Sequence, residues 1–255
     1  MVLKYTKEGK IATLTLNRPD ALNALNIELI SEISKALIDF MRDDNLWVGI
    51  ITGAGEKAFC AGADIKEALP RLKEFRNLPW AEPPFFRGLK LWKPLVAAVN
   101  GHALGGGLEV ALLCDVRIAS ENATFGVPEV TLGLIPAWGA TQRLPRAIPT
   151  ALAAEMLMTG RMINAQEAYR IGLVNKVVPL ADLMNSARQM AEILCKPGPL
   201  AVRAAKKAML DGLNVSLPQG LEVEKEMTDY IIGTEDFIEG TTAFIEKRKP
   251  QWKVR

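Results

Sequence analysis

Apolar and polar positions alternate at the start of the chain and then recur at helical spacing. Leu3–Tyr5 and Ile11–Leu16 alternate on either side of a Gly-containing turn, which predicts an antiparallel hairpin. Apolar residues then recur every three or four positions, which predicts an amphipathic helix over residues 27–44 with Asn26 as its N-cap. The mostly apolar run Val48–Thr52 predicts a buried strand.

The succession of strand and helix recurs further along the chain. Leu95–Asn100 predicts a second buried strand, which leads through Gly105-Gly106-Gly107 into an apolar helix that ends near Cys114. Val116–Ala119 predicts the strand that follows this helix. Strands that alternate with helices indicate an α/β domain.

Beyond about Pro179 the strand signal ends, and four helices account for the remainder, near residues 181–195, 199–212, 217–231 and 234–248. Two pairs match the capping-box pattern, Ser216 with Gln219 and, on an earlier helix, Asn164 with Glu167. The helix-breaking run Lys196-Pro197-Gly198-Pro199 marks the start of an all-helical C-terminal extension. We therefore expect a core over residues 1–195 and a helical region over residues 196–255.

Composition excludes several classes of protein. The chain has 255 residues, 49% of them hydrophobic and 24% charged, which suits a large buried core and argues against disorder. Thirty-one basic and 29 acidic residues are interspersed and leave a charge of +2, so nucleic acid is not the expected partner. The N-terminus has no signal-like apolar run, and no segment approaches the roughly 20 apolar residues that span a bilayer. We expect a cytoplasmic protein without a membrane partner.

The three cysteines carry no chemical signal of their own. Cys60, Cys114 and Cys195 are odd in number and widely spaced, which argues against a disulfide framework and against a zinc site. Cys60 precedes a Gly-rich turn, but nothing marks His102, the single histidine, as its catalytic partner. We expect all three thiols to pack as small apolar groups.

Two small-residue turns could instead present backbone donors. Phe59–Ile65 follows a predicted strand, and its small residues let a ligand approach the backbone closely. Gly105-Gly106-Gly107 lies where a strand enters a helix, so its first-turn N–H groups favour negative charge. A nucleotide loop is excluded because the Lys-Ser/Thr pair and the G-x-G-x-x-G pattern are missing. Oxyanion binding and tight helix–strand packing both remain open.

Glu109 and Glu129 are acids in apolar surroundings. Glu109 lies in the first turn of an otherwise apolar helix, and Glu129 follows Gly126-Val127-Pro128 twenty positions later. Two desolvated carboxyl groups near each other leave one protonated and one ionised near neutral pH, which suits proton transfer and the activation of water. The alternative for Glu109 is that it caps its own helix or pairs with Arg117.

Six short segments occur in the order in which one enzyme family carries them: Asn17–Leu25, Ala58–Lys66, Gly105–Glu109, Phe125–Glu129, Thr141–Leu144 and Phe244–Arg248. Over the whole chain they resemble the enoyl-CoA hydratase/isomerase family, also called the crotonase family. Each segment alone is weakly specific, whereas six in register are strongly specific.

The resemblance implies an α/β fold of the crotonase type. This is a spiral of ββα units with a helical C-terminal region that forms a trimer, commonly doubled to a hexamer. It implies that backbone N–H groups of Ala63 and Gly106 form an oxyanion hole for the thioester oxygen. Glu109 resembles the carboxylate that deprotonates water, and Glu129 resembles the acid that protonates C2.

The resemblance also implies a substrate. Ala24 and Ala61 would lie along the adenine of coenzyme A, while Phe244 and Lys247 resemble C-terminal residues that approach CoA, from the same or a neighbouring subunit. The implied activity is addition of water across the 2,3-double bond of an enoyl-CoA, a lyase reaction. The resemblance implies no metal and no redox cofactor, and CoA is not a separate cofactor because it is part of the substrate.

The chain departs from the usual hydratase pattern just before Thr141. Ala137 stands where the family offers a backbone N–H to the catalytic water, and Trp138 stands where the family has a small residue. The indole of Trp138 either walls the acyl pocket or fills a gap in the core. The insert Ala68–Leu91, rich in proline and aromatic residues, matches the region that shapes the acyl site, or it only covers the core.

Two other functions compete with hydration. A double-bond isomerase of the same family needs the same oxyanion hole and only one carboxylate, so the presence of both Glu109 and Glu129 favours the hydratase. A non-catalytic, RNA-associated member of the family is disfavoured by the near-neutral charge. The length and shape of the acyl group and the direction of the reaction stay undetermined at this point.

Overall fold

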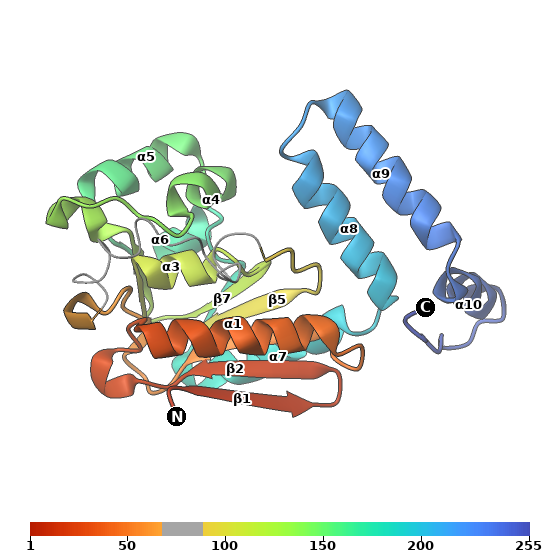
Figure 1. Cartoon of the computed structure of the whole chain (residues 1–255), viewed down its shortest axis with the longest axis horizontal. Coiled ribbons are helices and arrows are strands. Elements are labelled where there is room, and N and C mark those ends of the chain that lie inside the picture. The colour runs from red at the N-terminus through yellow and green to blue at the C-terminus, as the bar shows by residue number, and fades with distance from the viewer. Residues whose placement is uncertain (68–88) are drawn as a thin grey trace.

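Two sheets form the centre of the molecule (Figure 1). The structure is a computed structural model that describes residues 1–67 and 89–255. The larger sheet contains, in spatial order, β1 (Leu3–Glu8), β2 (Ile11–Leu16), β3 (Val48–Gly53), β5 (Leu95–Val99), β7 (Val116–Ser120) and β10 (Lys176–Val178). The β1–β2 pair is antiparallel, which confirms the predicted hairpin, and the remaining pairs are parallel.

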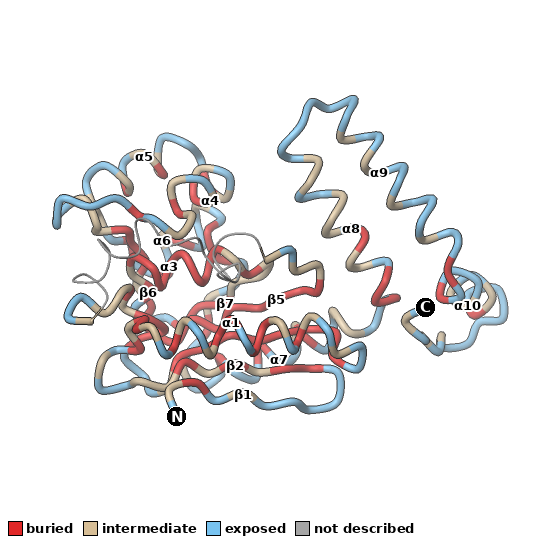
Figure 2. The backbone as a smooth tube through the Cα atoms, viewed as in Figure 1, coloured by how far each residue is buried: buried red, intermediate tan, exposed pale blue. Residues whose placement is uncertain are grey.

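Helices cover both faces of the larger sheet, so its central strands are buried throughout (Figure 2). Helix α1 (Ile27–Arg42) packs on β1 and β2, and α7 (Leu183–Leu194) packs on β3, β5 and β7. Alternate side chains of β3 join different apolar clusters: Ile51 lies in the cluster that includes α1, and Ile50 lies in the cluster that includes α7. A strand with two buried faces reads as a continuous apolar run, as the sequence predicted.

The ends of the helices follow local capping. Asn26 accepts a hydrogen bond from the Leu29 N–H and starts α1, which confirms the predicted N-cap. The helix ends at Arg42, two residues before the predicted end, where the buried Lys93 ammonium donates to the carbonyl groups of Phe40 and Asp43.

A second sheet of very short strands was not predicted. It contains β4 (Ala58–Cys60), β6 (His102–Leu104), β8 (Thr124–Gly126) and β9 (Ile163–Asn164). The strands β4, β6 and β8 each follow shortly after one long strand, β3, β5 and β7 respectively, so the chain repeats one unit of a long and a short strand. Strands of two or three residues are too short to show an alternating pattern, which is why the sequence does not reveal them.

The remaining helices of the core surround the second sheet and the loops beside it. They are α3 (Gly106–Ala111), α4 (Ala140–Ala147), α5 (Thr150–Thr159), α6 (Ala165–Arg170) and the short 3₁₀ turns η1 (Pro19–Ala21), η2 (Pro128–Leu132) and η3 (Leu180–Asp182). Helix α3 begins at the predicted Gly cluster but ends at Ala111, three residues before Cys114.

The C-terminal extension is helical, as predicted. It contains α8 (Pro199–Gly212), α9 (Leu217–Ile232) and α10 (Glu235–Ile245), and α8 and α9 pack side by side as a hairpin that leans away from the sheets (Figure 1). The chain then returns, and the indole N–H of Trp252 donates to the Lys196 carbonyl where the extension begins. Among the described helices, none is both long and apolar enough to cross a membrane.

One of the two predicted capping boxes is complete. The Gln219 side chain accepts from the Ser216 backbone N–H at the start of α9, as predicted. The Asn164 side chain accepts from the Glu167 N–H at the start of α6, but the reciprocal bond is missing. The prediction of a box is wrong there because the Glu167 carboxylate pairs with Arg161 instead.

Candidate active site

Two turns far apart in the sequence pair with each other and direct one N–H group outward. Leu25 donates to the Gly62 carbonyl at 2.8 Å, and Asp64 donates to the Leu25 carbonyl at 3.0 Å. This parallel bridge uses the donors and acceptors on either side of Ala63, so the N–H of Ala63 itself points away from the pairing.

The first turn of α3 supplies a second N–H group at the same place. Gly106 is the first residue of the helix, so its N–H has no intrahelical acceptor. The N-cap, Gly105, has a φ of 52° and no side chain that could accept from it. A Cβ placed on Gly62 would lie 3.4 Å from the Gly106 nitrogen, so the segment that carries Ala63 lies directly beside this turn. In residues 1–67 and 89–255, no acceptor binds the N–H of Ala63 or Gly106.

Glu109 lies one turn into α3 and is only 1% exposed. Its Oε1 accepts hydrogen bonds from the backbone N–H groups of Trp138 and Ala140, each at 2.8 Å, at the start of α4. Burial raises the pKa of the Glu109 carboxyl, and these two donors oppose that rise by favouring the ionised form. The alternative pairing with Arg117 is wrong, because Arg117 donates to the carbonyl groups of Cys114 and Leu173.

Glu129 lies in η2, immediately after β8, and its carboxyl group comes against the start of α3. A Cβ placed on Gly105 would lie 2.9 Å from Oε1 of Glu129. Burial raises the pKa of Glu129 to about 7, and the negative charge of Glu109 adds to this effect. No donor in the described parts of the chain bonds to its buried Oε2. The structure thus brings the two carboxyl groups together, as the sequence suggested.

The indole of Trp138 covers the other side of this turn. A Cβ placed on Gly106 would lie 2.5 Å from Cζ3 of Trp138, so only glycine fits beneath the ring. The side chain is partly buried against the main apolar core, and its backbone carbonyl accepts from Arg143 at 2.9 Å. Ala137, the residue before it, is exposed.

Comparison with known proteins identifies the family of this chain. The description of the enoyl-CoA hydratase/isomerase family matches residues 6–255. The chain belongs to this family.

Individual relatives in the family carry several different substrate names. The chain is 45% identical to a short-chain-enoyl-CoA hydratase of Clostridium acetobutylicum, over 95% of this chain and 94% of that protein. It is 42% identical to an (E)-benzylidenesuccinyl-CoA hydratase of Thauera aromatica, over 95% of each. The crystal structure of an enoyl-CoA hydratase from Bacillus anthracis superimposes with a TM-score of 0.91 at 40% identity and covers 100% of both chains.

The four positions that the resemblance predicts to bind CoA are only partly brought together in one chain. Ala61 donates to the Leu22 carbonyl, which places it beside the turn that carries Ala24. Phe244, which is 85% exposed, and Lys247 lie at and just beyond the end of α10, far from α3 at the opposite side of the molecule (Figure 1). Of the candidate insert Ala68–Leu91, residues 68–88 lie outside the described residues.

Several residues that support the candidate active site were not singled out from the sequence. Arg18 pairs with Asp64 at 2.9 Å and donates to the Ala24 carbonyl, so it ties the two paired turns together. Asn23, at a φ of 56°, donates to the carbonyl groups of Ala54 and Ala58. The segment Asn17–Leu25 stood out, but no spacing rule joins Arg18 to a residue 46 positions away.

The cysteines take the structural role that was expected. All three are free, and burial raises the pKa of the Cys60 and Cys114 thiols to about 12 and that of Cys195 to about 11. A thiol with such a pKa is not a nucleophile near neutral pH. In the part of the chain that the structure describes, no cluster of three or more His, Cys, Asp or Glu side chains is arranged to hold a metal ion.

Proposed function

We propose that this protein adds water across the 2,3-double bond of an enoyl-CoA thioester. The observation that carries the proposal is the convergence of two unpaired backbone N–H groups, the buried Glu109 carboxyl group and the half-buried Glu129 carboxyl group on the first turn of α3. Backbone donors suit a developing oxyanion, and a pair of carboxyl groups suits the two proton transfers of hydration.

The thioester oxygen accepts from the N–H groups of Ala63 and Gly106. As oxygen adds at C3, electron density moves from the double bond to this oxygen, and the two donors stabilise the resulting enolate. Removal of one oxyanion donor in other enzymes costs about 2.7–4 kcal/mol of transition-state stabilisation. Because these donors belong to the backbone, substitution at Gly106 acts by displacing the turn and not by deleting a donor.

The two carboxyl groups divide the proton transfers. Glu109 takes a proton from the attacking water, because two backbone N–H bonds favour its carboxylate form. Glu129 gives its proton to C2, because burial and the absence of a donor at Oε2 favour its protonated form. One water is consumed, and a proton must return from Glu109 to Glu129 before the next turnover. The steps use groups of this chain, the thioester and one water.

The acyl pocket lies beyond Gly106, where the Trp138 ring forms a wall and the exposed Ala137 lies beside it. Relatives of similar identity carry the names of short-chain and benzylidenesuccinyl-CoA hydratases, so overall identity does not select the acyl group. A large flat side chain at this wall favours short or planar acyl groups over long straight chains.

The CoA site is completed by a second copy of the chain. Ala24 and Ala61 contact the adenine, and Phe244 and Lys247 of a neighbouring subunit approach it from the other side. This arrangement is supported by the separation of α10 from α3 and by an open apolar groove of about 560 Å³ between α8, α9 and α10. Its lining includes Ala205, Met209, Met227 and Ile231. A trimer, or a hexamer built from two trimers, covers this groove.

A panel of trans-2-enoyl-CoA thioesters tests the proposed reaction. Hydration removes the absorbance of the conjugated thioester, and we expect turnover that falls by about 10²–10⁴-fold in Glu109→Gln and in Glu129→Gln. Migration of the double bond without uptake of water would identify an isomerase instead. Salt-dependent retention of RNA without turnover of any thioester would identify a binding protein.

A further inference from the structure

The turn after α5 lies directly against the segment that carries Glu129. Helix α5 ends at Thr159, and its C-cap, Gly160, has a φ of 71°. A Cβ placed on Gly160 would lie 2.9 Å from Cγ2 of Thr131 and 3.3 Å from Cα of Pro128, both in η2. The turn that begins at Gly160 therefore packs closely against Pro128 and Thr131 of η2.

The same turn also contacts the strand that leads into η2. Strand β9 pairs with β8, and Ile163 lies opposite Phe125. A Cβ placed on Gly126, the last residue of β8, would lie 2.8 Å from Cγ of Met162 and 3.4 Å from the Arg161 carbonyl oxygen. Residues 160–163 thus hold the chain just before Glu129 as well as the turn around it.

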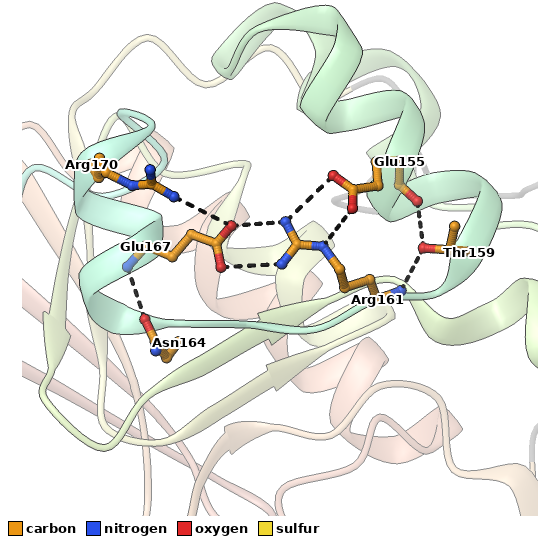
Figure 3. Close-up of polar contacts among 6 residues, drawn as sticks. All are labelled: Glu155, Thr159, Arg161, Asn164, Glu167 and Arg170. Carbon is orange, nitrogen blue, oxygen red and sulfur yellow. Dashed lines mark hydrogen bonds and ion pairs between the residues drawn. The ribbon is translucent and has the colours of Figure 1, made fainter.

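Arg161 fixes this turn between two helices, and Figure 3 shows its guanidinium between two carboxylates. The guanidinium nitrogens approach the Glu167 carboxylate of α6 at 2.8 and 3.1 Å, and Nε lies 3.1 Å from Oε1 of Glu155 in α5. The Arg161 N–H donates to the Thr159 hydroxyl, which donates to the Glu155 carbonyl. A bidentate guanidinium–carboxylate pair fixes the relative orientation of the two groups as well as their distance.

The position of the Glu129 carboxyl depends on this support. No donor in residues 1–67 and 89–255 bonds to its Oε2, and the carboxyl group accepts a hydrogen bond from the backbone of Glu129 itself. Its placement against Gly105 follows from the backbone of β8 and η2, which the 160–163 turn holds from outside. A partly exposed ion pair contributes little to stability by itself, so the geometry of the turn is the larger effect of this arginine.

We propose that Arg161 is a positioning residue for Glu129. Arg161 joins α5 to α6 and thereby holds the 160–163 turn against β8 and η2. The position of this turn determines where the Glu129 carboxyl group meets C2 of the substrate. The inference rests on the proposed function, in which Glu129 protonates C2. Arg161 itself touches no reacting atom.

Arg161→Gln and its matched control Arg170→Gln test this role. Arg170 reaches the same Glu167 carboxylate at 3.8 Å, but its side chain is 76% exposed and it lies outside the turn. At a temperature where both variants are folded, we expect kcat of Arg161→Gln to fall about 10- to 100-fold with KM within about twofold, as misplacement of a catalytic group does. The pH at which kcat falls because Glu129 loses its proton should also shift. Arg170→Gln should match the parent protein, and Arg161→Lys should recover part of kcat.

Measurements on Glu129→Gln and Glu167→Gln separate the possible failures. If Glu129→Gln keeps full activity, the proposed function is wrong. If Glu129→Gln is inactive while Arg161→Gln keeps the parent kcat and pH profile, and only its Tm falls, Arg161 is purely structural and the inference is wrong. Should Arg161→Gln not fold, Glu167→Gln replaces it, and a loss of kcat in the same direction is expected because half of the bridge is removed.

Discussion

The Trp138 ring lies on the backbone of Gly106, the residue whose N–H faces the proposed thioester oxygen. A Cβ on Gly106 would come within 2.5 Å of Cζ3 of this ring. The proposed wall of the acyl pocket and the proposed oxyanion hole therefore share one contact. A substitution of either residue should therefore change the position of the other.

The first prediction uses this contact. Gly106→Ala should lower kcat/KM by about 10²–10³-fold, since the new methyl pushes the turn away from the ring and displaces the N–H donor. In a Trp138→Ala background the same substitution should cost less, because the ring that blocks the methyl is gone. A double-mutant cycle measures the difference, and strict additivity would show that the two residues do not interact in this way.

The second prediction concerns the acyl group. Trp138→Ala should raise kcat/KM for C10 enoyl-CoA relative to C4 enoyl-CoA, because the pocket beyond C3 is lengthened. A core tryptophan without contact to substrate would instead cost roughly 3–5 kcal/mol of stability and leave this ratio unchanged. Tm and the C4 to C10 ratio, measured on the same preparation, decide between the two roles.

The third prediction concerns the two acids together. If Glu109 and Glu129 act on one water and one double bond, Glu109→Gln and Glu129→Gln should each remove most of the activity. The double variant should be hardly worse than either single one, since residues that act as a unit are non-additive. Independent factors that multiply would mean that the two groups serve separate steps.

The fourth prediction follows from the raised pKa of Glu129, about 7 against an ordinary value of 4.5. The folded chain binds this proton more tightly than the unfolded chain, so the associated stability is complete below about pH 4.5 and is lost as the pH rises through 7. Activity that requires the protonated acid should fall over the upper part of the same range.

Glu129→Gln checks this directly, because an amide stays neutral. Between pH 4.5 and pH 8 the parent protein should lose about 1–3 kcal/mol of unfolding free energy that Glu129→Gln does not lose. The variant therefore becomes more stable relative to the parent protein as the pH rises. Thermal unfolding at the two pH values measures the gain. A constant difference between the proteins across this range would show that the pKa of Glu129 is not raised.

The fifth prediction concerns assembly. Light scattering at micromolar concentration should give the mass of a trimer or hexamer, because the C-terminal helices leave Leu217, Phe244 and Ile245 more than three-quarters exposed in a single chain. Lys247→Ala should raise KM for the CoA thioester without changing the mass. A stable and active monomer would rule out a CoA site shared between subunits.

The sequence by itself determined the long elements and the chemical inventory. Buried strands such as Val48–Gly53 follow from short apolar runs, and amphipathic helices such as Ile27–Arg42 follow from helical periodicity. Both are local properties of the chain. The Gly cluster before Glu109 and the apolar setting of both acids could also be read directly. The order of six motifs indicated the family, and the resemblance then predicted the roles of the candidate site residues.

Only the tertiary structure decided which groups meet. The second sheet, the bridge between Leu25 and Ala63 and the pairing of Glu167 with Arg161 join residues through contacts that no local pattern encodes. The alternative pairing of Glu109 with Arg117 is wrong for the same reason, because the folded chain brings the N–H groups of Trp138 and Ala140 to the Glu109 carboxylate instead. Short-range patterns fix secondary structure, whereas hydrogen bonds between distant segments depend on how those elements pack.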